Sequence, residues 1–217
     1  MKRIAILGAS GHGKVVAEIA ELNGFDEVVF FDDAWTDNGG NKGGSAEFPW
    51  DVIGNTESLL GSHGKYEGCV VAIGHNKTRL EKHTLLKQAG ARFVSLIHPA
   101  ATVSKYTELG EGSVVMANAT INPFVKVGEA CIVNTGATID HDCILQDAVH
   151  VSPGANLGGG VGLGSYSWVG IGACVKQGIK IGSDVMVGAG AAVVKEVPDH
   201  QTVLGVPARP QSDGSCK

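Results

Sequence analysis

The stretch INPFVKVGEACIVNTGATIDHDCILQDAVHV, residues 121–151, decides the fold. It places isoleucine, leucine or valine at every sixth residue, and the same phase continues without a break from Ile97 to Val193. A run of this length in one fixed phase does not arise by chance. Small residues often follow four positions after an aliphatic one, at Ala101, Ser113, Ala119, Ala137, Ala155, Ala173 and Ala191.

A period of six residues has a direct physical interpretation. Each hexapeptide forms a short strand and a corner, three hexapeptides complete one triangular coil, and stacked coils bury a column of aliphatic side chains. The repetitive span holds roughly five such coils. Glycine, at 32 of 217 residues, supplies many tight corners. The sequence therefore predicts a parallel β-helix domain over residues 96–210, with a flexible tail at 211–217.

The first 95 residues have a different pattern, in which strand-like and helix-like segments alternate. The expected strands are KRIAILG, VVFFDD, CVVAIG and ARFVSLI, and the expected helices are GKVVAEIAELNG, NTESLL and NKTRLEKHTLLKQAG. Alternation of this kind indicates a parallel sheet with helices on its faces. Residues 1–95 are therefore predicted to form a Rossmann-like α/β domain with a small parallel sheet. The glycine-rich segment 34–50 is predicted to be a surface loop, and its role is left open.

Charge and cysteine content narrow the class of function. The formal net charge is −5 and no basic stretch is present, so nucleic acid is not expected as a partner. The first apolar run is broken after four residues, too short for a signal peptide or a membrane span, so we expect a cytoplasmic protein without membrane insertion. The five cysteines form no C-x-x-C pair, so neither a disulfide framework nor a cysteine zinc site is indicated.

The first expected strand ends in a glycine-rich turn, GASGHGK, at residues 8–14. It nearly matches a phosphate-binding P-loop, but Val15 stands where a magnesium-binding serine or threonine is required. A glycine turn that opens a helix presents backbone N–H groups and the helix dipole to an anion. We therefore expect a nucleotide diphosphate to bind without hydrolysis, and a purely structural turn remains the alternative.

The hexapeptide tract contains one group of titratable residues, TIDHDC, at residues 138–143. A histidine between two carboxylates is suited to general-base catalysis. An imidazole accepts a proton at neutral pH, and a carboxylate on its other nitrogen fixes the tautomer and stabilises the imidazolium. The alternative interpretation is a solvated polar corner without chemistry.

These features together resemble a known family. An α/β domain beginning with GASGHGK, followed by a β-helix that ends with KEVP and GVPAR, is similar to the sialic-acid and bacillosamine acetyltransferases among the hexapeptide-repeat acyltransferases. The likeness is greatest to the N-acetyltransferases that convert UDP-4-amino-4,6-dideoxy-N-acetylglucosamine to UDP-N,N′-diacetylbacillosamine for bacterial glycan assembly. It implies a left-handed parallel β-helix, acetyl-CoA as co-substrate, no metal, and a homotrimer with acetyl-CoA between neighbouring chains.

The resemblance also implies roles for single residues. His141 would be the general base, with Asp142 as its carboxylate partner where the group more usually has glutamate, and Gly159 would offer a backbone N–H to the oxyanion. The acetyl-CoA site would comprise His150 at the thioester and Ile171 and Ala189 along the pantetheine, with Ala189 narrowing a slot where glycine is expected. The UDP-sugar site would comprise Gly11, His12, Gly13, Asp32, Asp33, Gly74 and Asn134.

Three other functions remain open at this stage. An O-acetyltransferase acting on a sialic acid would use the same machinery with a hydroxyl acceptor. A carbonic anhydrase of the γ type shares the β-helix but needs three zinc-binding histidines, and only His141 and His150 lie within the central coils. A non-catalytic nucleotide-sugar sensor would bind no acetyl-CoA.

Overall fold

The computed structural model describes residues 1–34 and 49–211, which divide into two compact units. Unit 1 comprises Met1–Pro99 and Glu111–Val114, and unit 2 comprises Ala100–Gly110 and the chain from Val115 onward. The sequence placed the division between residues 95 and 96 and did not assign residues 111–114 to the first unit. The expected surface loop and the expected tail lie almost wholly outside the described residues.

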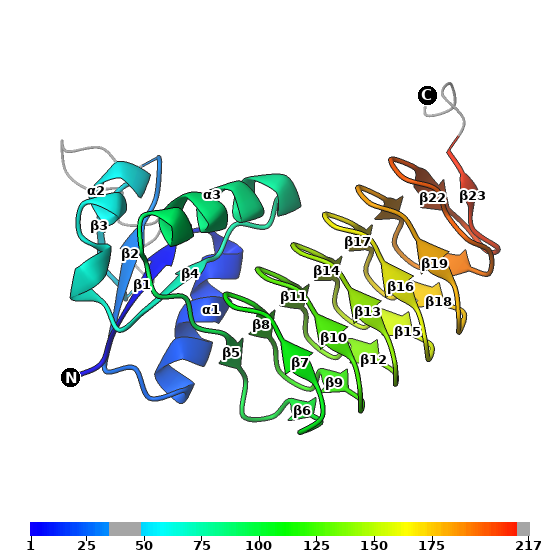
Figure 1. Ribbon diagram of the computed structural model, residues 1–217, viewed down its shortest axis with the longest axis horizontal. Coiled ribbons are helices and arrows are strands. Elements are labelled where there is room, and N and C mark those ends of the chain that lie inside the picture. Colours follow the sequence, from blue (N-terminus) through cyan, green and yellow to red (C-terminus); the bar gives the residue numbers. More distant parts are fainter. Residues whose placement is uncertain (35–48, 212–217) are drawn as a thin grey trace. The chain divides into compact units, whose positions relative to one another are not determined.

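Unit 1 contains the predicted small parallel sheet, in the strand order β3-β2-β1-β4 (Figure 1). Its strands are β1 Arg3–Leu7, β2 Glu27–Phe31, β3 Val52–Gly54 and β4 Gly68–Val71. Its helices are α1 Gly11–Leu22, α2 Thr56–Leu60, the 3-10 helix η1 His63–Lys65 and α3 Asn76–Gln88. Strand β3 and η1 were not anticipated. Because β1 pairs in parallel with both β2 and β4, the turns that follow these three strands lie at one edge of the sheet.

The helices form where local sequence supports them. The buried positions of α1 are Gly13, Val16, Ala17, Ile19 and Ala20, which recur at helical spacing. Helix α2 begins after Asn55, whose side-chain oxygen accepts a hydrogen bond of 2.9 Å from the Ser58 amide and so caps the first turn. Among the described residues, no helix has both the length and the apolar character needed to cross a membrane.

The expected strand over ARFVSLI is not continuous, and that prediction was wrong. Only Cys69 of β4 pairs with this segment: its amide donates to the Arg92 carbonyl at 2.8 Å, and its carbonyl accepts from the Val94 amide at 3.3 Å. The chain then forms the two-residue strand β5, Leu96–Ile97, and the Leu96 amide donates to the Ser113 carbonyl at 3.0 Å. The apolar run therefore serves two separate hydrogen-bonding partners rather than one sheet edge.

Unit 2 is the predicted left-handed parallel β-helix, built from two-residue strands that recur coil after coil (Figure 1). One sheet contains β6 Thr102–Val103, β9 Thr120–Ile121, β12 Thr138–Ile139, β15 Asn156–Leu157, β18 Cys174–Val175 and β21 Ala192–Val193. A second contains β7 Glu108–Leu109, β10 Lys126–Val127, β13 Ile144–Leu145, β16 Gly162–Leu163 and β19 Lys180–Ile181. The third contains β8 Val114–Val115, β11 Ile132–Val133, β14 His150–Val151, β17 Trp168–Val169, β20 Met186–Val187, β22 Thr202–Leu204 and the antiparallel β23 Arg209–Pro210.

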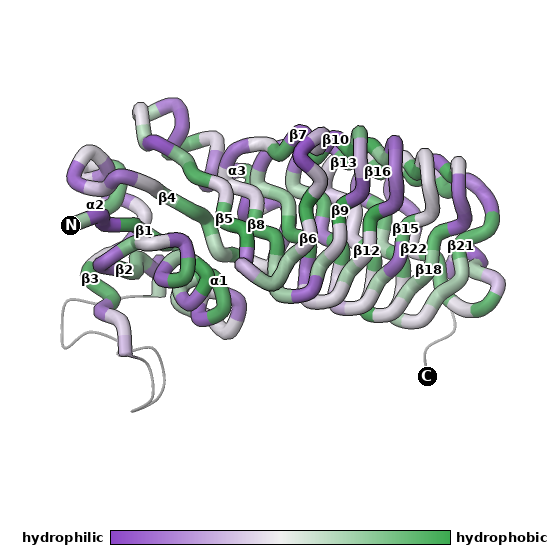
Figure 2. Tube along the Cα trace, turned by 90° about the horizontal axis from the view of Figure 1, so that it is seen from below, coloured by the Kyte–Doolittle hydropathy of each residue, from purple (hydrophilic) through white to green (hydrophobic). Residues whose placement is uncertain are grey.

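The sixth-residue aliphatic side chains form the predicted interior column. Every member from Val115 to Val193 is buried, whereas Ile97, Val103 and Leu109 are half-buried. Hydrophobic and hydrophilic stretches accordingly alternate along the coils (Figure 2). Parallel pairing puts residues eighteen apart beside each other, as in Ile139 and Leu157. An outward-facing side chain therefore contacts its counterparts on the coils before and after it.

The corners also repeat with period six. Every sixth residue from Gly112 to Gly190 has a positive φ, whether or not it is glycine. This left-handed conformation costs an ordinary residue about 1–2 kcal/mol, and asparagine and aspartate tolerate it better. Asp142, with φ of 59°, occupies one such corner.

The interior column gives the first testable prediction. Ile121 is 1% exposed, so Ile121→Ala leaves a cavity and should lower the free energy of unfolding of the β-helix by about 2–5 kcal/mol. Denaturant unfolding followed by circular dichroism measures this loss. Ile144→Ala, at an outward-facing position 48% exposed, is the control and should cost less than about 0.5 kcal/mol. An equal loss of unfolding free energy in the two variants would contradict the assignment of Ile121 to the interior column and of Ile144 to the outer surface.

Candidate active site

The corner between β12 and β13 carries the predicted histidine–carboxylate pair. His141 Nδ1 lies 2.7 Å from Asp142 Oδ2, and the two side chains are 60% and 62% exposed. The positive φ of Asp142 turns the corner, so that two consecutive residues face each other outside the coil. The contact holds the Nδ1 proton on the Asp142 side and leaves Nε2 available as a base.

A second carboxylate, Asp140, lies on the other side of the imidazole. Its Oδ2 is 3.9 Å from His141 Nε2. Its Oδ1 accepts two hydrogen bonds of 2.8 Å, from the His141 amide and from Asn122 Nδ2 on the preceding coil. The sequence placed the imidazole between two carboxylates but assigned a role only to Asp142.

The charges at this corner favour a protonated imidazole. The hydrogen bond that Asp142 accepts from His141 Nδ1 raises the pKa of His141 above its usual range, and the charge of Asp140 raises it further. Hydrogen bonds from Asn122 and from the His141 amide lower the pKa of Asp140, so this carboxylate stays ionised at neutral pH. A base with a raised pKa is stabilised once it has taken a proton.

Gly159, on the following coil, packs directly against the histidine ring. A Cβ at this position would lie 2.7 Å from His141 Cε1 and Nε2, so a side chain here would displace the imidazole. The Gly159 backbone N–H also contributes to lowering the pKa of Asp140. The carbonyl of His141 accepts a hydrogen bond of 2.8 Å from the Gly160 amide, which connects the corners of the two coils. The oxyanion role of Gly159 stays a prediction.

His150 and Asn134 were assigned to different ligands but lie in contact. Asn134 Nδ2 is 3.1 Å from His150 Nε2. His150 is 8% exposed, and its ring stacks on that of Trp168, with ring centroids 4.7 Å apart. Trp168 donates from Nε1 to Ser152 Oγ at 2.6 Å. Trp168 was not anticipated, although it lies eighteen residues after His150 and its β17 pairs with β14 in that register.

Ile171 and Ala189 lie at one corner on consecutive coils. Both are exposed, Ile171 to 62%, and the Gly190 amide donates to the Ile171 carbonyl at 2.8 Å. An isoleucine so exposed provides an apolar surface without a covering partner among the described residues of the chain.

In unit 1, the glycine turn after β1 contains a half-buried histidine, His12. Gly8 has a φ of 112°, and a Cβ on Gly13 would collide with the Gly8 carbonyl. The Nε2 of His12 is buried and has no hydrogen-bond partner within the described ranges. Burial, aided by the nearby charge of Arg79, lowers the pKa of His12 to about 4. His12 is therefore neutral at physiological pH.

The backbone of the turn after β4 is hydrogen-bonded by the side chain of Arg79, a residue that is 1% exposed. Its guanidinium donates to the carbonyls of Ile73 and Gly74 at 3.0 and 3.1 Å, and to Asn76 Oδ1 at 2.8 Å. The buried cation thus fixes the backbone around Gly74, one of the expected substrate-binding positions.

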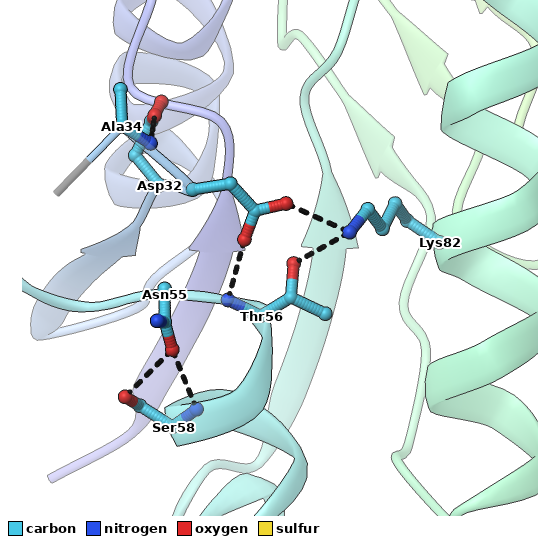
Figure 3. Close-up of polar contacts among 7 residues, drawn as sticks. Asp32, Ala34, Asn55, Thr56, Ser58 and Lys82 are labelled. Carbon is cyan, nitrogen blue, oxygen red and sulfur yellow. Dashed lines mark hydrogen bonds and ion pairs between the residues drawn. The ribbon is translucent and has the colours of Figure 1, made fainter.

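Asp32 and Asp33 at the end of β2 organise the neighbouring backbone. Asp32 accepts hydrogen bonds from the amides of Ala9 and Ala34, at 2.8 and 2.9 Å. Figure 3 shows Lys82 of α3 reaching the Thr56 hydroxyl, at 3.1 Å. Lys82 also forms a 2.7 Å ion pair with Asp33, whose other oxygen accepts from the Thr56 amide at 2.9 Å.

Lys82 was not anticipated from the sequence, because its partner lies far away in the chain. Burial acts to raise the pKa of Asp33, but the hydrogen bonds from Lys82 and Thr56 outweigh it and hold this pKa below its usual range. Within residues 1–34 and 49–211, no group of three or more histidine, cysteine, aspartate or glutamate residues is placed to hold a metal ion.

Known proteins share both units. Residues 3–86 match the family described as the PglD N-terminal domain. The chain is 37% identical over 119 residues to UDP-N-acetylbacillosamine N-acetyltransferase of Bacillus subtilis (strain 168), and this match covers 54% of the chain and only 52% of that enzyme. The shared region thus spans about half of the curated relative.

Two solved structures are similar over nearly the whole chain. One is the acetyltransferase domain of PglB from Neisseria gonorrhoeae FA1090 in complex with acetyl coenzyme A, with 42% identity, a TM-score of 0.88, and coverage of 97% of this chain and 99% of that one. The other is a histidine-to-asparagine variant of perosamine N-acetyltransferase from Caulobacter crescentus in complex with CoA and GDP-perosamine. It has 36% identity, a TM-score of 0.91 and 98% coverage of both chains.

The electrostatics of the corner give the second prediction. Asp142→Asn removes the largest cause of the raised pKa of His141, so that pKa should fall toward its usual value near 6.5. Titration of the His141 ring by NMR measures the change. Asp184→Asn, which alters the partner of His200, is the matched control and should leave the titration of His141 unchanged. An unchanged pKa in Asp142→Asn would show that the observed contact has no electrostatic effect.

Proposed function

The chain belongs to the family of acetyl-CoA-dependent sugar N-acetyltransferases that join a PglD-type N-terminal domain to a hexapeptide-repeat β-helix, and we propose the following reaction for it. It transfers acetyl from acetyl-CoA to the 4-amino group of a UDP-4-amino-4,6-dideoxy-N-acetylhexosamine, giving UDP-N,N′-diacetylbacillosamine. The observation that carries the proposal is the exposed His141–Asp142 pair, 2.7 Å apart, at a corner of the β-helix.

His141 acts as the general base in this proposal. The amine nitrogen bonds to the thioester carbon, the carbon–sulfur bond breaks, and His141 Nε2 takes the proton that the nitrogen loses. The imidazolium then returns this proton to the departing thiolate. Asp142 fixes the Nδ1 tautomer and stabilises the imidazolium. The 2.7 Å contact supports the first part of this role, and the raised pKa of His141 supports the second. The Gly159 N–H is shared in this proposal between the Asp140 carboxylate and the oxyanion, and His150 binds the thioester.

The nucleotide sugar binds to the turns at one edge of the sheet in unit 1. Gly11 and Gly13 at the start of α1 offer backbone N–H groups to the diphosphate, beside the positive end of the helix dipole. His12, neutral and with its buried Nε2 lacking a partner among the described residues, provides a polar atom for the ligand. Asp32, Asp33, Gly74 and Asn134 complete the proposed substrate-binding set.

A substrate panel tests the proposed reaction. The protein is incubated with acetyl-CoA and UDP- or GDP-linked sugars that carry an amino or a hydroxyl group at carbon 4, because GDP-perosamine is bound in a similar structure. Release of free thiol gives the rate, and mass spectrometry locates the acetyl group. We expect transfer to the UDP-amino sugar. Transfer to hydroxyl groups alone would favour the O-acetyltransferase, and no turnover with any sugar would contradict the proposal.

The third prediction concerns the base. His141→Ala should lower kcat by at least about 100-fold and leave unfolding unchanged, because this side chain is mostly exposed. His200→Ala is a matched control, since His200 is another exposed histidine beside a carboxylate, Asp184, and it should retain wild-type kcat. Near-normal turnover in His141→Ala would remove His141 from the mechanism.

We also propose a homotrimer with shared sites. One corner of a coil is too flat to enclose a ligand as long as acetyl-CoA, and ligand sites favour concave surfaces between units. A three-fold ring of triangular coils repeats one groove three times in a closed heterologous arrangement. His141 of one chain then works beside the exposed corner formed by Ile171 and Ala189 of the next.

The fourth prediction tests this sharing by mixing variants. His141→Ala and Ile171→Asp should each be inactive, but trimers reassembled from equal amounts should regain about a quarter of wild-type activity, because each site draws its halves from two chains. A chain with both substitutions, mixed with His141→Ala, restores nothing and serves as the control. Full activity of a monomer, or no recovery in mixed trimers, would refute the shared site.

A further inference from the structure

We infer that Asp140 is a positioning residue for this reaction, which accepts one N–H of the acceptor amine while His141 Nε2 takes the other. The inference rests on the proposed function and adds to it a residue on the second side of the imidazole. A primary amine has two N–H groups, and fixing both directs its lone pair toward the thioester carbon.

The spacing of the two acceptors fits this role. Asp140 Oδ2 and His141 Nε2 are 3.9 Å apart, too far for a direct hydrogen bond. One nitrogen atom placed between them lies within about 2.9 Å of both, a normal hydrogen-bond distance. The Asp140 side chain is 43% exposed, so a ligand can reach it.

The carboxylate is held in place before any ligand arrives. Its Oδ1 accepts from Asn122 on the preceding coil and from the His141 amide, both at 2.8 Å, and the Gly159 N–H on the following coil also stabilises the ionised group. Its Oδ2 lies 3.9 Å from His141 Nε2. A carboxylate has about four lone-pair sites, so one more hydrogen bond can be accepted. Such preorganisation lowers the cost of orienting the acceptor.

Asp140 also acts on the charge of the base. The charged groups facing His141 are Asp140 and Asp142 of its own corner. Asn122 and Pro123 of the preceding coil and Gly159 and Gly160 of the following one carry no charge. A negative charge near an imidazole favours its protonated form, so removing that charge lowers the pKa of His141.

The fifth prediction compares Asp140→Asn with the wild type. The pKa of His141, followed by NMR, should fall, and the acidic limb of the kcat/KM profile should move to lower pH with it, because the base is active when neutral. The amide is a weaker acceptor than the carboxylate, so kcat/KM above this limb should fall by about 10- to 100-fold, with a raised KM for the amino sugar.

Two further variants separate positioning from folding. Asn122→Ala keeps the Asp140 carboxylate but removes one of its hydrogen-bond donors, so it should raise the KM for the amino sugar by a smaller factor than Asp140→Asn does. It also replaces Asp140→Asn as the test if that variant fails to fold. Asp147→Asn is the matched control, because Asp147 likewise accepts an amide of the preceding coil, that of Glu129 at 2.8 Å, but at another corner. It should leave both pH profile and KM unchanged.

Suppose that Asp140→Asn lowers stability yet leaves both the acidic limb of the kcat/KM profile and the KM for the amino sugar unchanged. That result would show that Asp140 has a purely structural role, and it would overturn the inference. A wild-type protein inactive on every amino sugar would instead contradict the proposed function. In that case the NMR titration still decides whether Asp140 acts on His141, since it needs no substrate, and an unchanged pKa in Asp140→Asn would overturn the inference there as well.

Discussion

The stacking of coils at an eighteen-residue register is the constraint on which the rest of unit 2 depends. Inward aliphatic side chains are buried only if each coil lies directly over the one before, and parallel backbone pairing enforces the same alignment. The outward-facing side chains are aligned in the same eighteen-residue register. Asn122 supports Asp140 and His150 stacks on Trp168, and each of these pairs spans one whole coil. The interior thus positions the polar groups on the exterior.

The corners add a second constraint, because every sixth residue must adopt the left-handed backbone conformation with a positive φ. Glycine satisfies it at many corners, whereas Phe124 and Tyr166 adopt it at a cost in backbone strain. Aspartate is among the residues that tolerate this conformation, so Asp142 meets the demand of the fold and contacts His141 at the same time. Phe124 stacks on Tyr106, with ring centroids 5.5 Å apart, at the same corner of the preceding coils.

The fold could be predicted from the sequence because its signals are local and repeated. Aliphatic residues at every sixth position predict the coils, and alternating segments predict the parallel sheet of unit 1. The His141–Asp142 contact was also within reach, since the two residues are neighbours. Contacts between distant residues were missed: pairing Lys82 with Asp33 requires the sheet order, and the charge of Arg79 that acts on His12 comes from a helix more than sixty residues later in the chain. Trp168 could have been found by stepping eighteen residues from His150. The apolar run at 91–97 misled because apolar composition does not reveal which partner a segment pairs with.

The register also determines which changes of length the β-helix can accept during evolution. An insertion of six residues between Asn122 and Asp140 would preserve the aliphatic phase but carry every later residue to the next side of the triangle, separating the amide from its carboxylate. An insertion of eighteen residues beyond Ala189 would add a complete coil and leave the corner with His141 intact. Chains of this kind are therefore expected to vary in length by whole coils, and mostly beyond the corner that carries His141.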